Sequence, residues 1–99
     1  MVEMTKLTDK EIHENLSKLD GWRLEGGSIA KDFQFKDFAT ALDFMNRVGV
    51  IADKELNHHP DWSNSYNRVS IKLTTHSAGG LSELDFKLAE AADAIASGL

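Results

Sequence analysis

Residues 61–75 have the sequence DWSNSYNRVSIKLTT. Apolar and polar side chains alternate from Val69 to Thr74, which is the pattern of an antiparallel strand with one buried and one exposed face. Asp61–Tyr66 forms another strand candidate just before it, and Asn67-Arg68 lies between the two. The stretch therefore predicts a β-hairpin around Asn67-Arg68, with strands at 61–66 and 69–75.

A second hairpin is predicted nearer the N-terminus. The strand candidates Trp22–Glu25 and Ser28–Phe35 are separated by Gly26-Gly27. Two glycines favour a two-residue hairpin turn, because both can take positive φ. One side of the second strand would then carry three apolar side chains: Ile29, Phe33 and Phe35.

Helices are predicted before, between and after the hairpins. The first spans Thr8–Leu19, because Thr8 and Glu11 have the spacing of a capping box and Gly21 provides a stop. The longest spans Asp37 to about Asn57 and ends before Pro60, since residues that precede proline avoid helical backbone angles. The last runs from about Ser82 to Ser97, with Ser82 as its cap and Asp85 at its third position.

The longest helix carries a broad apolar stripe, which predicts a core-facing helix and makes it a candidate for contact with another subunit. Spacings of four and three alternate along Phe38, Leu42, Met45, Gly49, Ala52 and Leu56. Four more residues widen the stripe: Ala41, Phe44, Val48 and Ile51.

The predicted order is therefore α-β-β-α-β-β-α within one domain, residues 1–99. Two hairpins can merge into one four-stranded antiparallel sheet with helices packed on one face, which is an α+β two-layer fold. The exposed sheet face and the sheet edges would be candidates for oligomer contacts.

Composition narrows the class of protein. The 99 residues carry 11 Lys and Arg against 16 Asp and Glu, a formal charge of −5, which disfavours direct binding to nucleic acid. The chain has no cysteine, which removes disulfides, thiolate metal sites and a cysteine nucleophile. No apolar stretch is long enough to cross a membrane. We expect a cytoplasmic protein.

The residues that could carry chemistry are mostly histidines. His58 and His59 end the long helix, where the helix dipole favours a protonated imidazole and hence a proton donor. His76 follows the last strand, and Asp85 lies in the first turn of the last helix. The loop 77–81 lets the chain fold back, so that both could face the helix end that carries His58. The pattern indicates a histidine-rich cleft suited to proton transfer.

Simpler interpretations remain open for each residue taken singly. A His-His pair at a helix end is commonly a solvated cap, and Asp85 could serve only as a favourable charge at a helix start. Trp62 could be a core residue instead of part of a pocket. Adjacent histidines point apart, so a zinc ion would need another ligand such as His76 or Asp85.

At these residues the sequence resembles the pterin-4a-carbinolamine dehydratase family. The resemblance runs from the Trp22 region through the final helix. The motifs that carry it, in order, are His58-His59-Pro60, Trp62, Tyr66, Thr74-Thr75-His76, Gly80-Leu81-Ser82 and Asp85. One position departs from the pattern: the residue four before His58 is often acidic in the family, whereas here it is Lys54, with Glu55 beside it.

The resemblance implies a four-stranded antiparallel sheet and dimers that pair into tetramers. It implies dehydration of 4a-hydroxytetrahydrobiopterin to quinonoid dihydropterin with neither a metal nor another cofactor, a step that recycles the cofactor of aromatic amino-acid hydroxylases. It assigns catalytic roles to His58, His59 and His76, whose counterparts in the family bind the pterin and move protons. Our hypothesis is that His58 and His76 share the acid and base roles, while His59 chiefly orients the pterin. The resemblance also implies substrate-binding roles for His59, Pro60, Trp62, Thr75 and Asp85.

Three alternatives stay open. Some animal members of the family stabilise dimers of a homeodomain transcription factor, so the chain could be a non-enzymatic interaction module. A pterin role linked to molybdopterin is the second alternative, and a metal-binding protein is the third.

Overall fold

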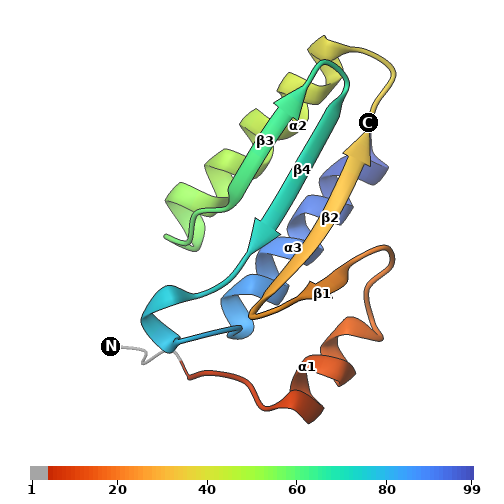
Figure 1. Ribbon diagram of the computed structural model, residues 1–99. Helices are drawn as coiled ribbons and strands as arrows, with labels where there is room; N and C mark the ends of the chain where they lie inside the picture. The colour runs from red at the N-terminus through yellow and green to blue at the C-terminus, as the bar shows by residue number, and fades with distance from the viewer. Residues whose placement is uncertain (1–4) are drawn as a thin grey trace.

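The two predicted hairpins form and join into one sheet in the computed structural model, which describes residues 5–99. The strands are β1 (Arg23–Glu25), β2 (Ser28–Gln34), β3 (Asp61–Ser65) and β4 (Arg68–Leu73). Their order across the sheet is β1-β2-β4-β3, and every neighbouring pair is antiparallel (Figure 1). Residues 1–4, which the single-domain prediction includes, lie outside the described residues.

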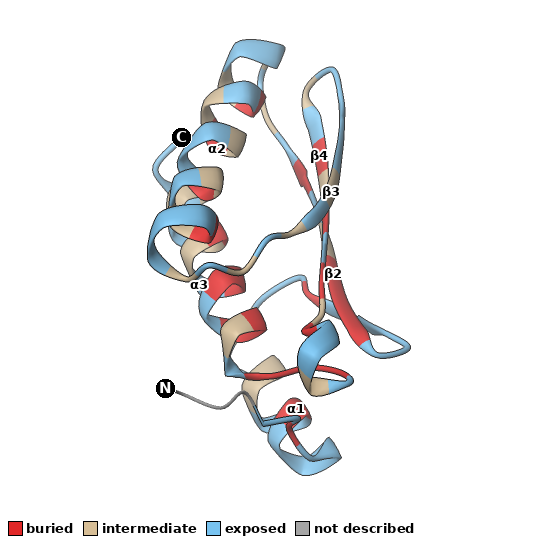
Figure 2. Cartoon of the chain, turned by 90° about the vertical axis from the view of Figure 1, so that its left-hand side faces the viewer, coloured by how far each residue is buried: buried red, intermediate tan, exposed pale blue. Residues whose placement is uncertain are grey.

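The helices are α1 (Asp9–Leu16), α2 (Phe38–Val50) and α3 (Glu83–Ser97). Helices α2 and α3 cover one face of the sheet, and both layers carry buried residues (Figure 2). The sheet contributes Ile29, Phe33, Val69, Ile71 and Leu73 to the core, all of them buried. The predicted α+β two-layer fold and its α-β-β-α-β-β-α order are confirmed.

The turns differ in detail from the prediction. Between β1 and β2 only Gly26 takes positive φ, 59°, which is the pattern of a type II′ turn. The second turn consists of Tyr66-Asn67, one residue earlier than predicted, and Tyr66 adopts a φ of 50°. Tertiary contact explains the shift: the Asn67 side chain donates a hydrogen bond of 2.7 Å to the carbonyl of Phe35, which draws this residue toward the end of β2.

The predicted face of α2 was partly wrong. Phe38 and Leu42, the first two members of the main stripe, are 45% and 44% exposed, whereas the buried residues are Ala41, Phe44 and Val48. The apolar residues of this helix span a wider arc than a single sheet can cover. The sheet therefore buries Ala41, Phe44 and Val48, which were predicted only to widen the main stripe.

The helix ends also differ from the prediction. The first helix has the predicted capping box at Thr8 and Glu11 but stops at Leu16, and Leu19 beyond it still packs against the core. After Val50, α2 widens into one π-helical turn, η1 (Ile51–Glu55). Within residues 5–99, no helix combines the length and the apolar character needed to cross a membrane.

Candidate active site

His58 is positioned by the irregular end of the long helix. The wide turn of η1 lets the backbone N–H of His58 donate to the carbonyl of Ala52 at 2.8 Å. Asn57 takes the left-handed conformation with φ 47°, which asparagine tolerates better than most residues. The chain therefore reverses direction just before the histidine pair and the start of β3 at Asp61.

The imidazole of His58 is bound to a buried carboxylate. Its Nε2 lies 2.5 Å from Oδ1 of Asp85, and Asp85 is fully buried. The other carboxylate oxygen accepts hydrogen bonds from the Thr75 hydroxyl at 2.8 Å and from the Ser82 backbone N–H at 2.9 Å. A carboxylate can only accept, so Nε2 of His58 donates and Nδ1 is the ring nitrogen left for other partners.

Asp85 is held in place by the start of α3. Ser82 caps this helix, and Ser82 and Asp85 form a capping box, so that the same carboxylate closes the helix end and binds His58. The hydroxyls of Thr75 and Ser82 lie 2.7 Å apart and complete the network. Asp85 thus binds His58, Thr75 binds Asp85, and both Thr75 and Asp85 are buried away from the surface.

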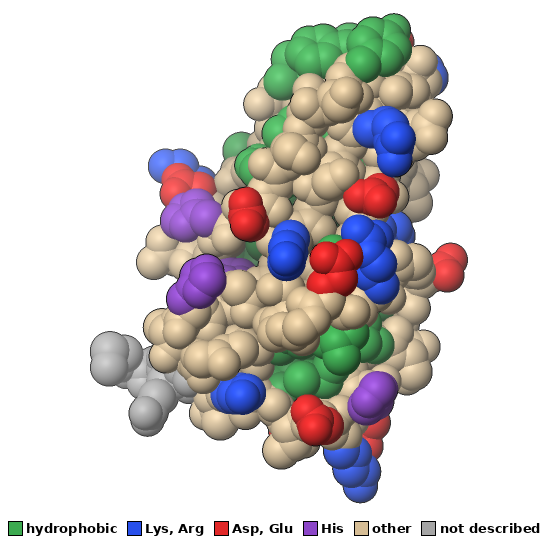
Figure 3. All heavy atoms as spheres, in the orientation of Figure 1, with side chains coloured by type: hydrophobic (Ala, Val, Ile, Leu, Met, Phe, Trp, Pro, Cys, Tyr) green, Lys and Arg blue, Asp and Glu red, His purple; other side chains and the backbone are tan. Residues whose placement is uncertain are grey.

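His59 and His76 lie around one cavity of about 270 Å³. We call it the histidine cavity; its lining residues are Ser28, His59, Asp61, Lys72, Thr74 and His76. His59 is exposed, and its Nε2 lies 2.9 Å from Oδ1 of Asp53 on η1. His76 begins a short 3₁₀ helix, η2 (His76–Ala78), directly after the sheet. Figure 3 shows histidine side chains gathered at this side of the molecule, with charges of both signs beside them.

The structure therefore separates the predicted histidines into two settings. His59 and His76 line the cavity, whereas the His58 side chain is only 11% exposed and is bound to Asp85. Trp62 is half-buried and packs against the core, and Pro60 is half-buried between His59 and β3.

Sequence reasoning missed four of the lining residues: Ser28, Asp61, Lys72 and Thr74. The alternation from Val69 to Thr74 placed Lys72 and Thr74 on the outward face of the strand but did not indicate a cavity there. Ser28 could not be found in this way, because its place depends on the pairing of β2 with β4, which sets Ile29 opposite Leu73.

A structural metal site needs several ligands close together. Within residues 5–99, no three His, Cys, Asp or Glu side chains are grouped closely enough to hold a metal ion.

Comparison with known proteins identifies the family. The sequence profile described as pterin 4 alpha carbinolamine dehydratase matches residues 5–95. The chain belongs to the pterin-4a-carbinolamine dehydratase family. A protein of Sulfurisphaera tokodaii is 52% identical over 90 residues, which are 91% of this chain and 96% of that protein. Its name assigns it to this dehydratase provisionally.

Two similar solved structures extend the comparison. A transcriptional coactivator/pterin dehydratase from Brucella melitensis has a TM-score of 0.89 and 48% identity, covering 93% of this chain and 99% of its own. A pterin dehydratase-like protein, described as a RuBisCO assembly factor in the α-carboxysome, has a TM-score of 0.65 and 25% identity, covering 77% of this chain and 89% of its own. The two similar structures thus have different described roles.

Proposed function

We propose that this chain dehydrates a 4a-hydroxytetrahydropterin to the quinonoid dihydropterin. The observation that carries the proposal is that two imidazoles, His59 and His76, line one cavity while the adjacent His58 is bound to a buried carboxylate. A cavity of about 270 Å³ is slightly smaller than the usual size of small-molecule sites, which begins at about 300 Å³.

The reaction needs proton transfer at two neighbouring atoms. The N5 lone pair expels the hydroxyl from C4a, and the hydroxyl leaves as water only if an acid protonates it. A base then removes the N5 proton. A positioned general acid or base contributes about 10²–10⁴-fold in rate. Histidines on either side of the C4a–N5 bond would therefore supply the acid and the base that the reaction requires.

The proposed roles are those expected from the sequence, combined with the hydrogen bonds of His58 in the structure. His58 and His76 exchange protons with the substrate, and His59 orients the pterin ring. Because Asp85 occupies Nε2 of His58, this histidine acts through Nδ1, and the carboxylate stabilises the ring whenever it becomes positively charged. Thr75 and Asp85 then support His58 instead of touching the pterin. Pro60 and Trp62 shape the segment that carries His59.

The test is a stopped-flow dehydration assay with freshly generated substrate, from which spontaneous dehydration is subtracted. His58→Ala and His76→Ala, made separately, should each lower kcat/KM by about tenfold or more. His13→Ala is the matched control, because His13 is exposed on α1, outside the cavity. If neither His58→Ala nor His76→Ala loses about tenfold, the assignment of roles is wrong.

The proposed physiological role is to recycle a tetrahydropterin that an aromatic hydroxylase has oxidised. We propose that the active form of the protein is a homodimer or a homotetramer. Exposed apolar side chains on α2, namely Phe38, Leu42 and Val50, support self-association.

A second candidate function is that of a protein-interaction module. It is favoured by the described roles of the two structural relatives, a coactivator and an assembly factor. A wild-type chain that leaves the rate of dehydration at its spontaneous value would favour this second function over the first.

A further inference from the structure

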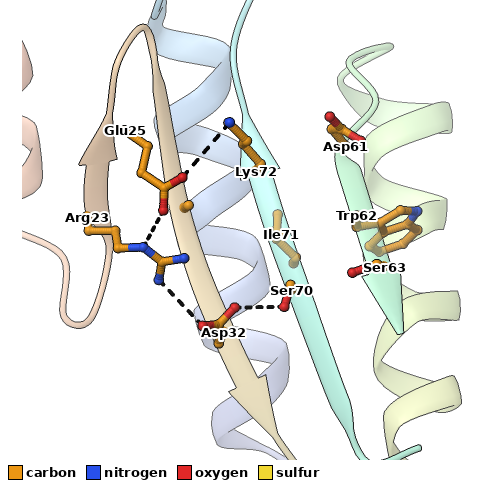
Figure 4. A pocket seen from close by; sticks show the side chains of 10 residues that line it. Arg23, Glu25, Asp32, Asp61, Trp62, Ser63, Ser70, Ile71 and Lys72 are labelled. Atoms are coloured by element: carbon orange, nitrogen blue, oxygen red, sulfur yellow. Dashed lines mark hydrogen bonds and ion pairs between the residues drawn. The ribbon is translucent and has the colours of Figure 1, made fainter. Parts of the chain in front are cut away.

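The sheet face opposite the helices contains a hollow of about 290 Å³. We call it the open-face hollow. It lies over β1, β2, β4 and β3, and its polar rim includes Arg23, Glu25, Asp32, Ser63 and Ser70 (Figure 4). Its floor is low because Ala30, whose register partners are Arg23 and Lys72, carries no side chain beyond Cβ. A sheet face with small residues at its centre and long charged residues around them is shaped to receive a ligand.

The open-face hollow adjoins the histidine cavity. Asp61 and Lys72 line both spaces, and these two residues are directly opposite each other in the pairing of β3 with β4. A ligand whose ring lies between His59 and His76 can therefore extend a substituent over Asp61 and Lys72 into the open-face hollow.

Hydrogen-bonding groups of both kinds line the open-face hollow. Lys72 Nζ lies 3.9 Å from Oε1 of Glu25, whose other oxygen pairs with Arg23. Arg23 Nη1 lies 3.6 Å from Oδ2 of Asp32, and Oδ1 of Asp32 accepts from the Ser70 hydroxyl at 2.7 Å. These ion pairs form a row across three strands (Figure 4). Donors and acceptors therefore alternate within reach of one bound group.

The charges of the open-face hollow select among substituents. Its two cations, Arg23 and Lys72, stand against three carboxylates, those of Glu25, Asp32 and Asp61, which gives a formal charge of 2 − 3 = −1. A phosphate or carboxylate would be repelled at such a site. A neutral hydroxyl, in contrast, both donates and accepts, so it matches the alternating groups.

We propose that the open-face hollow binds the substituent at C6 of the pterin and that it prefers a neutral polyhydroxyalkyl chain. This inference rests on the proposed function. In a tetrahydropterin, C6 is bonded to N5, and N5 is bonded to C4a, so this substituent begins next to the reacting atoms. Residues Arg23, Asp32 and Ser70 then determine specificity without taking part in the chemistry.

The test compares three substrates in the dehydration assay: the 4a-hydroxy adducts of 6-methyl-, 6-(1,2-dihydroxypropyl)- and phosphorylated 6-(dihydroxypropyl)-tetrahydropterin. In Asp32→Ala and Ser70→Ala, kcat/KM for the dihydroxypropyl substrate should fall about three- to tenfold, the effect of one or two lost hydrogen bonds. The same quantity for the 6-methyl substrate should stay unchanged. Gln34→Ala is the matched control, since Gln34 is an exposed residue of β2 that is not part of the lining.

A charge reversal provides the second arm. Asp32→Lys changes the formal charge of the open-face hollow by two units and should raise kcat/KM for the phosphorylated substrate relative to the dihydroxypropyl one. Two failures are distinguishable. If the wild type does not accelerate dehydration of the 6-methyl substrate, the proposed function is wrong. If the wild type does accelerate that reaction, but the variants have the same relative kcat/KM for the three substrates as the wild type, the open-face hollow is not a C6 subsite.

Discussion

The imidazole of His58 and the carboxylate of Asp85 lie 2.5 Å apart although the two residues are 27 positions apart in the chain. One comes from the irregular end of α2 and the other from the first turn of α3. Asp85 is also fully buried and bonded to Thr75 and Ser82, so its orientation is fixed independently of His58. The pair therefore fixes which ring nitrogen of His58 carries the proton.

Asp85→Asn should lower kcat by about a hundredfold with little change in KM. The amide oxygen of the new side chain would accept from Ser82 and Thr75, which leaves its NH₂ group toward Nε2 of His58. Nε2 must then accept, and the proton moves to Nδ1. Nitrogen NMR of the His58 ring reports the change of tautomer directly. An unchanged tautomer together with unchanged kcat would show that Asp85 only caps the helix.

Sequence patterns predicted the elements of this site better than its assembly. The capping residues Ser82 and Asp85 and the position of His58 at a helix end are local features, and local spacing reveals them. The difference between a largely covered His58 and an exposed His59 depends on the π-helical turn and on Asn57, and neither has a periodic signal in the sequence. The buried arc of α2 likewise depends on where the sheet meets the helix. Long-range packing decides both.

Substitutions of Asn57 test whether the backbone reversal before His58 contributes to stability and activity. Asn57→Ala should lower the free energy of unfolding by about 1 kcal/mol relative to Asn57→Gly, because a Cβ disfavours the left-handed conformation while glycine adopts it freely. The alanine variant should also lose more activity, since relief of this strain displaces His58. Urea denaturation and kcat/KM of both variants provide the measurements. Equal stability of the two variants would contradict a left-handed residue at this position.

Leu42 tests self-association through α2. Leu42→Lys places a charge on an exposed apolar side chain, and burying that charge between subunits is unfavourable, so sedimentation velocity should show a shift toward smaller species. Ala94→Lys adds the same charge at an exposed position of α3 and should leave the sedimentation coefficient unchanged. If both variants sediment like the wild type, the exposed part of α2 at Leu42 is not an oligomer contact.

We expect the dehydratase activity to be independent of metal ions. Purified protein should contain no stoichiometric zinc by elemental analysis, and treatment with a chelator should leave kcat/KM unaltered. Zinc bound one to one, with activity lost on its removal and restored on its return, would require a ligand set drawn from His58, His59, His76 and Asp85. It would also overturn the roles proposed for these residues.

Asp37 links the stability of α2 to pH. The hydroxyl of Thr40, at 2.6 Å, and the backbone N–H of the same residue, at 2.8 Å, both donate to Asp37 and lower the pKa of its carboxyl. A lowered pKa in the folded state means that the stabilising contribution is complete above the ordinary carboxyl value, about 3.9, and is lost as pH falls through the folded value.

The matched variant is Asp37→Asn, which keeps a good helix cap that cannot titrate in this range. The wild type should be the more stable of the two near neutral pH, and its advantage should shrink below about pH 4. Urea denaturation of both proteins near pH 7 and about pH 3 measures the difference. An advantage that stays constant, or grows, on acidification would mean that the carboxylate of Asp37 is not favoured by its contacts with Thr40.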